Sequence, residues 1–209
     1  MRLLVPNSRN SQAYAVIRSL RNQAERIVAL MERQWSGESV FAHGAFVREV
    51  DRRVGTTWPM GVWERGHEGG DTVAEQRYMA EVERVCEEER IDWAFPSVEG
   101  TIHVLAKNED RLRRRGVSLV CPPAEVVERV NDKLDCMRHL TEAGVVVPRT
   151  LDLSTVPSSA LAQDPGFPLV VKPRRANASR GVHVARNLHE VREACRSAGR
   201  LNGRLLVQE

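Results

Sequence analysis

Short apolar runs alternate with amphipathic segments in the N-terminal part of the chain. The runs predict buried strands at residues 3–5, 26–31, 91–95 and 117–120. Between the first two runs, apolar residues recur with the period of a helix face, at Ala13, Val16, Ile17 and Leu20. Strands that alternate with helices indicate an α/β fold that starts with a parallel sheet.

Two further helices are expected in the same part of the chain. One covers residues 73–90 and places the glutamates at 87–89 in solvent. The other starts near Ile102 and ends in the basic cluster at residues 111–116.

Residues 35–71 fit no regular period. A short strand is predicted near residues 46–50. Trp58 and Trp63 are explained as well by core packing as by a substrate pocket or a partner surface.

The pattern changes after residue 122, where a Pro-Pro pair predicts a domain boundary. Asn131 is expected to cap a helix that ends at Gly144. Antiparallel strands are then predicted at residues 169–172, 182–185 and 205–208. Between the last two strands, Asn187 and Glu190 have the spacing of a capping box and predict the start of a helix.

Composition limits the classes of function. The chain has 209 residues, 42% of them apolar, and a net charge of +3 from 31 basic and 28 acidic side chains. This near balance does not imply a nucleic-acid partner, and the basic run at residues 111–115 is better explained as a solvated helix end. No apolar run approaches the length of a membrane span. We therefore expect a cytoplasmic protein with no membrane partner.

Neither the cysteines nor the histidines have the spacing of metal ligands. The four cysteines lie far apart, at Cys86, Cys121, Cys136 and Cys195. Without a C-x-x-C motif they argue against a zinc site and against a disulfide framework. We expect reduced thiols and no metal site in this chain.

The most informative stretch covers residues 168–185. An apolar strand leads to Lys172, and a loop of small residues and arginines follows, with Arg174, Arg175 and Arg180. A lysine at the end of a buried run, beside backbone N–H groups and guanidinium groups, suits a phosphate. Because the lysine precedes the loop and a strand follows it, the pattern is neither a P-loop nor a dinucleotide fingerprint. By itself the stretch fits a solvated arginine-rich hairpin equally well.

Three segments in order carry a resemblance to a known superfamily. They are VNDKLDCMRHLTEAGVVVPRT at 130–150, FPLVVKPRRANASRGVHVARN at 167–187 and LLVQE at 205–209. Together they resemble the ATP-grasp superfamily, in particular the carbamoyl-phosphate synthase large subunit and related carboxylate–amine ligases. The resemblance implies a Rossmann-like pre-ATP-grasp domain at 1–122, a linking helix segment at 123–148 and the first α+β lobe at 149–209, with the second lobe missing.

The resemblance also implies which residues bind ATP. Lys133 and Lys172 would contact the phosphates, a flap would cover them, and the backbone of Glu209 would meet the adenine amino group. The flap residues are Ser179, Arg180 and Gly181. The plainer alternatives are a solvated lysine at 133, a lysine at a strand edge at 172 and a polar strand end at 209.

Two departures from the family pattern limit what the resemblance implies. Ala176 and Ala178 stand where the flap commonly has glycine, so the flap is expected to be stiffer. The second lobe, which would supply the Mg²⁺ ligands and bind the acyl substrate, does not occur in these residues. The sequence fits a fragment and a natural truncation equally. In a fragment, the apolar surface on which the second lobe would dock is exposed and predicts self-association or instability.

Two functions remain open. The first is the ATP-binding N-terminal part of a ligase that activates an unknown carboxylate as an acyl phosphate for attack by an unknown amine. The second is a nucleotide-binding or partner-binding module without catalysis. ATP and Mg²⁺ are the cofactors that the resemblance implies.

Overall fold

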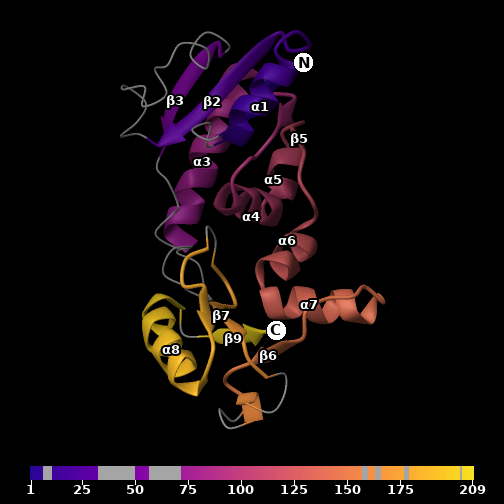
Figure 1. Ribbon diagram of the computed structural model, residues 1–209. Coiled ribbons are helices and arrows are strands. Elements are labelled where there is room, and N and C mark those ends of the chain that lie inside the picture. The colour runs from indigo at the N-terminus through magenta and orange to yellow at the C-terminus, as the bar shows by residue number, and fades with distance from the viewer. Residues whose placement is uncertain are drawn as a thin grey trace. The chain divides into compact units, whose positions relative to one another are not determined.

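The computed structural model describes residues 1–6, 11–32, 50–56, 72–156, 160–162, 166–176, 179–202 and 204–209 (Figure 1). These residues form two compact units that divide between Val127 and Glu128. Each unit has its own sheet and its own hydrophobic core.

The first unit contains a five-stranded sheet in which all neighbouring strands are parallel. The strand order is β3-β2-β1-β4-β5. The strands are β1 (Arg2–Val5), β2 (Arg26–Glu32), β3 (Arg52–Thr56), β4 (Trp93–Ala94) and β5 (Ser118–Leu119). The predicted α/β fold with a parallel start is confirmed.

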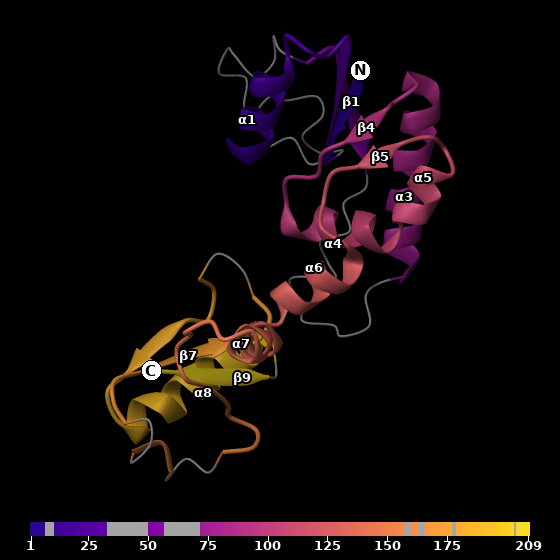
Figure 2. The same cartoon turned by 90° about the vertical axis from the view of Figure 1, so that its right-hand side faces the viewer.

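Helices cover both faces of this sheet. They are α1 (Ser11–Leu20), α3 (Thr72–Glu89), α4 (Glu99–Lys107) and α5 (Glu109–Arg113). Successive strand residues point to opposite faces, so Leu3 packs with Ile17 of α1 while Leu4 packs with Met79 of α3. Figure 2 shows α1 and α3 on opposite sides of the strands. Because these strands are buried on both faces, their sequences are short continuous apolar runs.

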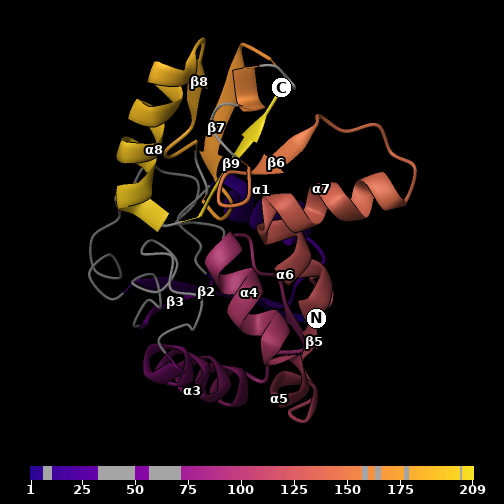
Figure 3. The same cartoon turned by 90° about the horizontal axis from the view of Figure 1, so that it is seen from below.

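The second unit contains a four-stranded antiparallel sheet with the order β6-β9-β7-β8. The strands are β6 (Thr150–Asp152), β7 (Leu169–Pro173), β8 (His183–Ala185) and β9 (Leu205–Gln208). Helix α8 (Leu188–Asn202) lies beside β7 and β8 (Figure 3), and Val191 and Ala194 pack against Val171 and Val207. One face of this sheet is therefore covered by α8.

The start of α8 has the predicted capping box. The Glu190 N–H donates to Asn187 Oδ1 at 3.0 Å, and Asn187 Nδ2 donates to Glu190 Oε1 at 2.9 Å. The Arg186 N–H also donates to Glu190 Oε2, so hydrogen bonds between residues close in sequence stabilise the helix start.

Two helices connect the units' sheets, α6 (Ala124–Asn131) and α7 (Lys133–Glu142). The predicted end of α7 is confirmed: Gly144 has φ +77°, and the Val145 N–H donates to the Leu140 carbonyl at 2.9 Å. The predicted start is wrong. Asn131 ends α6, and Asp132 caps α7 with bonds from the Leu134 and Asp135 N–H groups. Either residue type caps helices, so local propensity could not choose between them.

Several other expectations need correction. The helix expected from Ile102 to the basic cluster is two helices separated at Asn108. The sequence missed α6, β3 and β6. Their apolar patterns are short, and pairing to a neighbouring strand stabilises β3 and β6. Of the strand predicted near residues 46–50, only Val50 is among the described residues, and it is not in a strand. Trp58 and Trp63 lie outside the described residues.

The basic run and the acidic end of α3 neutralise one another. Arg111 donates to both carboxylate oxygens of Glu83 at 2.6 and 3.0 Å. Arg115 pairs with Glu83 and with Glu87. Among the described residues, every helix is too short or too polar to cross a lipid bilayer.

Glu89 was expected in solvent with its neighbours, but its side chain is buried, with 5% of the residue exposed. Its carboxylate accepts from Arg26 Nε at 2.5 Å and pairs with Arg52. Burial opposes ionisation, but the hydrogen bonds and charges of these arginines outweigh it and keep the pKa of Glu89 below its ordinary value.

We expect Glu89→Gln to lower the free energy of unfolding by about 1–3 kcal/mol, because it weakens charged hydrogen bonds to two arginines. Chemical denaturation at neutral pH measures the change. The matched control is Glu88→Gln, since Glu88 is exposed and its ion pairs, with Arg84 at 2.6 Å and with Arg52 at 3.7 Å, lie at the surface. That change should cost at most about 0.5 kcal/mol. Equal losses in the two variants would contradict a structural role for the buried carboxylate.

Candidate functional site

The two faces of the second unit's sheet differ in chemistry. Along β7, Leu169 and Val171 are buried in the core that α8 covers, whereas Val170 and Lys172 alternate with them on the other face. Lys172 pairs with Leu206 and Val170 pairs with Gln208 of β9. Paired residues of antiparallel strands share a face. Lys172 and Gln208 therefore lie on the sheet face opposite α8.

Lys172 is a half-buried cation on this face. Burial lowers the pKa of its ammonium group, because removal from water disfavours the charged form. Among the described residues, no carboxylate forms an ion pair with it. A desolvated ammonium group without an anionic partner is suited to an anion supplied by a ligand.

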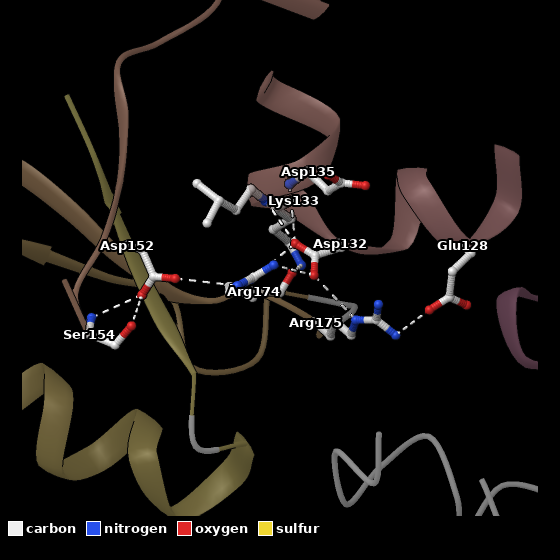
Figure 4. Close-up of polar contacts among 9 residues, drawn as sticks. Glu128, Asp132, Lys133, Asp135, Asp152, Ser154, Arg174 and Arg175 are labelled. Carbon is white, nitrogen blue, oxygen red and sulfur yellow. Dashed lines mark hydrogen bonds and ion pairs between the residues drawn. The ribbon is translucent and has the colours of Figure 1, made fainter. Parts of the chain in front are cut away.

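Next to Lys172 lies a network of charged residues that joins α7 to the end of β7 (Figure 4). Asp132 accepts from Arg174 Nη2 at 2.7 Å and from Arg174 Nε at 3.1 Å. Arg174 also donates to Asp152 at 3.3 Å. Arg175 pairs with Glu128 at 2.6 Å and with Asp132 at 3.5 Å. The network therefore connects α6, α7, β6 and the residues after β7.

The network favours the ionised forms of Asp132 and Asp152. Burial raises the pKa of Asp132, but hydrogen bonds from Arg174 and the Asp135 amide, with the two arginine charges, outweigh it, and the pKa is lowered. The Ser154 hydroxyl is the main cause of the lowered pKa of Asp152, and Arg174 contributes to it. The pKa of Arg174 is raised, mainly by its hydrogen bonds to Asp132. These groups are all ionised at neutral pH.

This arrangement corrects one expectation from the sequence. The loop was expected to offer three guanidinium groups to a phosphate. Instead, Arg174 and Arg175 are held by carboxylates of this chain. A planar guanidinium group matches a carboxylate with two parallel bonds, and Arg174 meets Asp132 in this way.

Lys133 is the first residue of α7 and is tied to the same loop. Its Nζ donates to the Ala176 carbonyl at 2.7 Å and lies 3.4 Å from the Arg174 carbonyl, which also accepts the Lys133 backbone N–H at 3.1 Å. A cation in the first turn of a helix is unfavourable by about 0.3–1 kcal/mol. Here the carbonyl oxygens offset that cost and hold the loop against the start of α7.

The predicted flap residues lie at an exposed turn before β8. Ser179 and Gly181 adopt left-handed conformations, with φ +57° and +70°. The Val182 N–H donates to the Ser179 carbonyl at 3.3 Å. Arg180 between them is exposed. Ala178 lies outside the described residues, and Ala176 is not left-handed. The backbone conformation at position 176 therefore does not require glycine.

Glu209 follows β9 and pairs with the residue before β6. Its N–H donates to the Arg149 carbonyl at 3.4 Å, and its Oε1 accepts from the Arg149 N–H at 3.2 Å. Its side chain is exposed.

The fold thus places Lys172 in β7 and Glu209 directly after β9 of the same sheet, and it ties Lys133 to the loop after β7. Ser179 and Arg180 are exposed, and Gly181 is half-buried. Sequence reasoning missed the roles of Asp132, Asp152 and Arg174. Asp132 directly precedes Lys133, and no sequence pattern indicated that it would form an ion pair with Arg174, which is 42 residues away in the chain. Within the described part of the chain, no group of three or more His, Cys, Asp or Glu side chains could hold a metal ion.

Comparison with known proteins identifies the fold. No family model matches the chain. A D-alanine–D-alanine ligase of Oceanobacillus iheyensis is 27% identical over 126 residues, covering 58% of this chain and 34% of the ligase. The biotin carboxylase domain of Hydrogenobacter thermophilus 2-oxoglutarate carboxylase, in complex with MgADP, ADP and bicarbonate, matches 99% of this chain and 44% of that one (18% identity, TM-score 0.65). An L-amino acid ligase of Bacillus licheniformis matches 100% of this chain and 46% of its own (18% identity, TM-score 0.68).

The chain has the fold of the N-terminal part of ATP-grasp enzymes. The predicted resemblance to this superfamily is confirmed at the level of fold. The chain spans less than half the length of each of these three proteins.

We expect Arg174→Met to lower the free energy of unfolding by about 2–4 kcal/mol at pH 6, since it leaves the buried Asp132 and the half-buried Asp152 with fewer partners. The matched control is Arg186→Met, which removes an exposed arginine 4.0 Å from Glu190 and should cost less than about 1 kcal/mol.

The pH dependence gives an independent check of the same network. Carboxylates with lowered pKa values stabilise the folded state above their unfolded pKa, about 3.9 for Asp, and this contribution is lost as the pH falls through their folded values. Thermal unfolding from pH 6 down to pH 2.5 should therefore show a smaller loss of stability in Arg174→Met than in the unsubstituted chain. Parallel pH profiles would contradict the assigned ion pairs.

Proposed function

We propose that this chain is the ATP-binding part of an ATP-grasp ligase, which activates a carboxylate as an acyl phosphate for attack by an amine. The observation that carries the proposal is Lys172, a half-buried ammonium group with no carboxylate partner among the described residues. The ATP-grasp fold supports it, because the motif that contains Lys172 is the one that contacts nucleotide phosphates in that superfamily.

In this proposal Lys172 neutralises charge on the nucleotide phosphates, and the turn at Ser179, Arg180 and Gly181 covers them. Lys133 holds the loop after β7 in position through the Ala176 carbonyl and contacts a phosphate when nucleotide is bound. The backbone beyond β9 at Glu209 meets the adenine. Fixed cations of this kind stabilise the charge that develops on a transferring phosphoryl group.

The proposed metal cofactor is Mg²⁺. Mg²⁺ would offset the negative charge of the nucleotide phosphates. We assign no ligand to it in this chain, since the described residues contain no suitable group. The complex of the H. thermophilus biotin carboxylase domain with MgADP supports the choice of metal.

The proposed substrate class is a carboxylate and an amine. The names of two similar proteins, a D-alanine–D-alanine ligase and an L-amino acid ligase, support this class. The motif order further suggests a carbamoyl-phosphate synthase-like reaction, in which bicarbonate is the carboxylate. A nucleotide-binding or partner-binding module without catalysis is the alternative.

Calorimetric titration of the 209-residue chain with Mg-ATP tests the nucleotide site. Lysine is rare in this chain, and its three lysines are Lys107, Lys133 and Lys172. We expect Lys172→Met to weaken binding at least about tenfold, the effect of losing one charged hydrogen bond.

Lys107→Met is the matched control, because Lys107 is exposed at the end of α4 in the other unit and should leave binding unchanged. Equal affinity of the Lys172→Met variant and the unsubstituted chain would remove Lys172 from the site. Absence of any ATP binding would contradict the proposed function.

A further inference from the structure

The side chain of Arg174 joins two elements of the second unit to the end of β7 (Figure 4). Its Nε and Nη2 donate to the carboxylate of Asp132, which caps α7, and its Nη1 donates to Asp152 at the end of β6. The side chains of Arg174, Asp132 and Asp152 are only 15%, 10% and 11% exposed. Three directed bonds from one planar group therefore hold the start of α7 and the end of β6 against the same residue.

The backbone of Arg174 takes part in the same junction. Its N–H donates at 3.0 Å to the carbonyl of Arg204, directly before β9. Its carbonyl accepts the backbone N–H of Lys133 at 3.1 Å and lies 3.4 Å from Nζ of that lysine. The ammonium group of Lys133 also donates to the Ala176 carbonyl at 2.7 Å. Arg174 is thus connected to Lys133 directly through its carbonyl and indirectly through Asp132.

These contacts determine where the charge of Lys133 lies. Lysine has a flexible four-carbon side chain, which loses conformational entropy when a ligand fixes it. Here the carbonyls of residues 174 and 176 fix Nζ. Because carbonyl groups are neutral, these bonds orient the ammonium group without cancelling its charge. A cation that is already ordered binds an anion more tightly than one that is ordered only on binding.

We propose that Arg174 is a positioning residue for nucleotide binding, because it sets the location of the Lys133 ammonium group through Asp132 and through its own carbonyl. The inference rests on the proposed ATP site, in which Lys133 contacts a phosphate. Arg174 does not bind the phosphate itself, since two carboxylates of this chain hold its guanidinium group.

Two substitutions separate this role from charge and from helix capping. Arg174→Lys keeps the positive charge, but a lysine cannot form two parallel bonds to Asp132 and a third bond to Asp152. Asp132→Asn keeps a side chain that caps helices about as well as aspartate, and it removes the anion that Arg174 pairs with.

Calorimetric titration with Mg-ATP of the unsubstituted chain, Arg174→Lys, Lys133→Met and the double variant tests the inference. Lys133→Met should weaken binding about tenfold, the effect of losing one charged hydrogen bond. Arg174→Lys should weaken it by about threefold to tenfold, and no more than Lys133→Met does. The double variant should bind as weakly as Lys133→Met alone, because Arg174 acts through Lys133.

Glu89→Gln is the matched control for lost stability. It weakens a buried ion pair in the first unit and should leave ATP affinity unchanged. Circular dichroism identifies a temperature at which each variant is folded, and Asp132→Asn, which should weaken binding by the same factor as Arg174→Lys, serves if Arg174→Lys does not fold.

The outcomes distinguish this inference from the proposed function. Unchanged affinity in Arg174→Lys and Asp132→Asn overturns the positioning role and leaves the ATP site standing. A double variant that binds more weakly than Lys133→Met also overturns it, because Arg174 would then act independently of Lys133. Failure of the unsubstituted chain to bind Mg-ATP overturns the proposed function itself.

Discussion

The carboxylate of Asp132 is the group on which the arrangement of the second unit depends. It accepts N–H groups from the first turn of α7 and, at the same time, two hydrogen bonds from Arg174 after β7. A single buried anion thereby fixes where a helix begins and where a strand ends. The Lys133 contacts with the Arg174 and Ala176 carbonyls follow from this, because they require the loop after β7 to lie against the start of α7.

The same network explains why lysine and arginine have different roles here. Arginine forms paired bonds to carboxylates, and Arg174 uses this geometry to join Asp132 with Asp152. Lysine carries a compact point charge. The ammonium group of Lys133 lies near two carbonyl oxygens, and Lys172 lies on the sheet face opposite α8. The carboxylates near the proposed phosphate site are therefore already paired with arginine, and among the described residues none of them pairs with Lys172.

The alternation of side chains along a strand divides the sheet of the second unit into two surfaces with separate roles. Val171 and Val207 pack under α8 and hold the sheet together. Lys172 and Gln208, each displaced by one residue from that core, face the opposite side. One antiparallel pair of strands thus places a cation on the sheet face opposite α8.

Local sequence determined a large part of this protein. The apolar runs predicted β1, β2, β7 and β9, the Asn187–Glu190 pair predicted the start of α8, and Gly144 predicted the end of α7, because strand burial, capping and left-handed turns depend on residues close together in the chain. The ordered motifs also indicated the ATP-grasp fold. Tertiary structure alone decided the ion pairs. Whether Glu89 is solvated, whether Arg174 is available to a phosphate, and which hydroxyl the Gln208 amide contacts all depend on partners 37 to 63 residues away. No local sequence pattern identifies partners so far apart in the chain. Charged and amide groups are solvated by water in the unfolded chain, and only folding removes this water and decides which groups bond to one another.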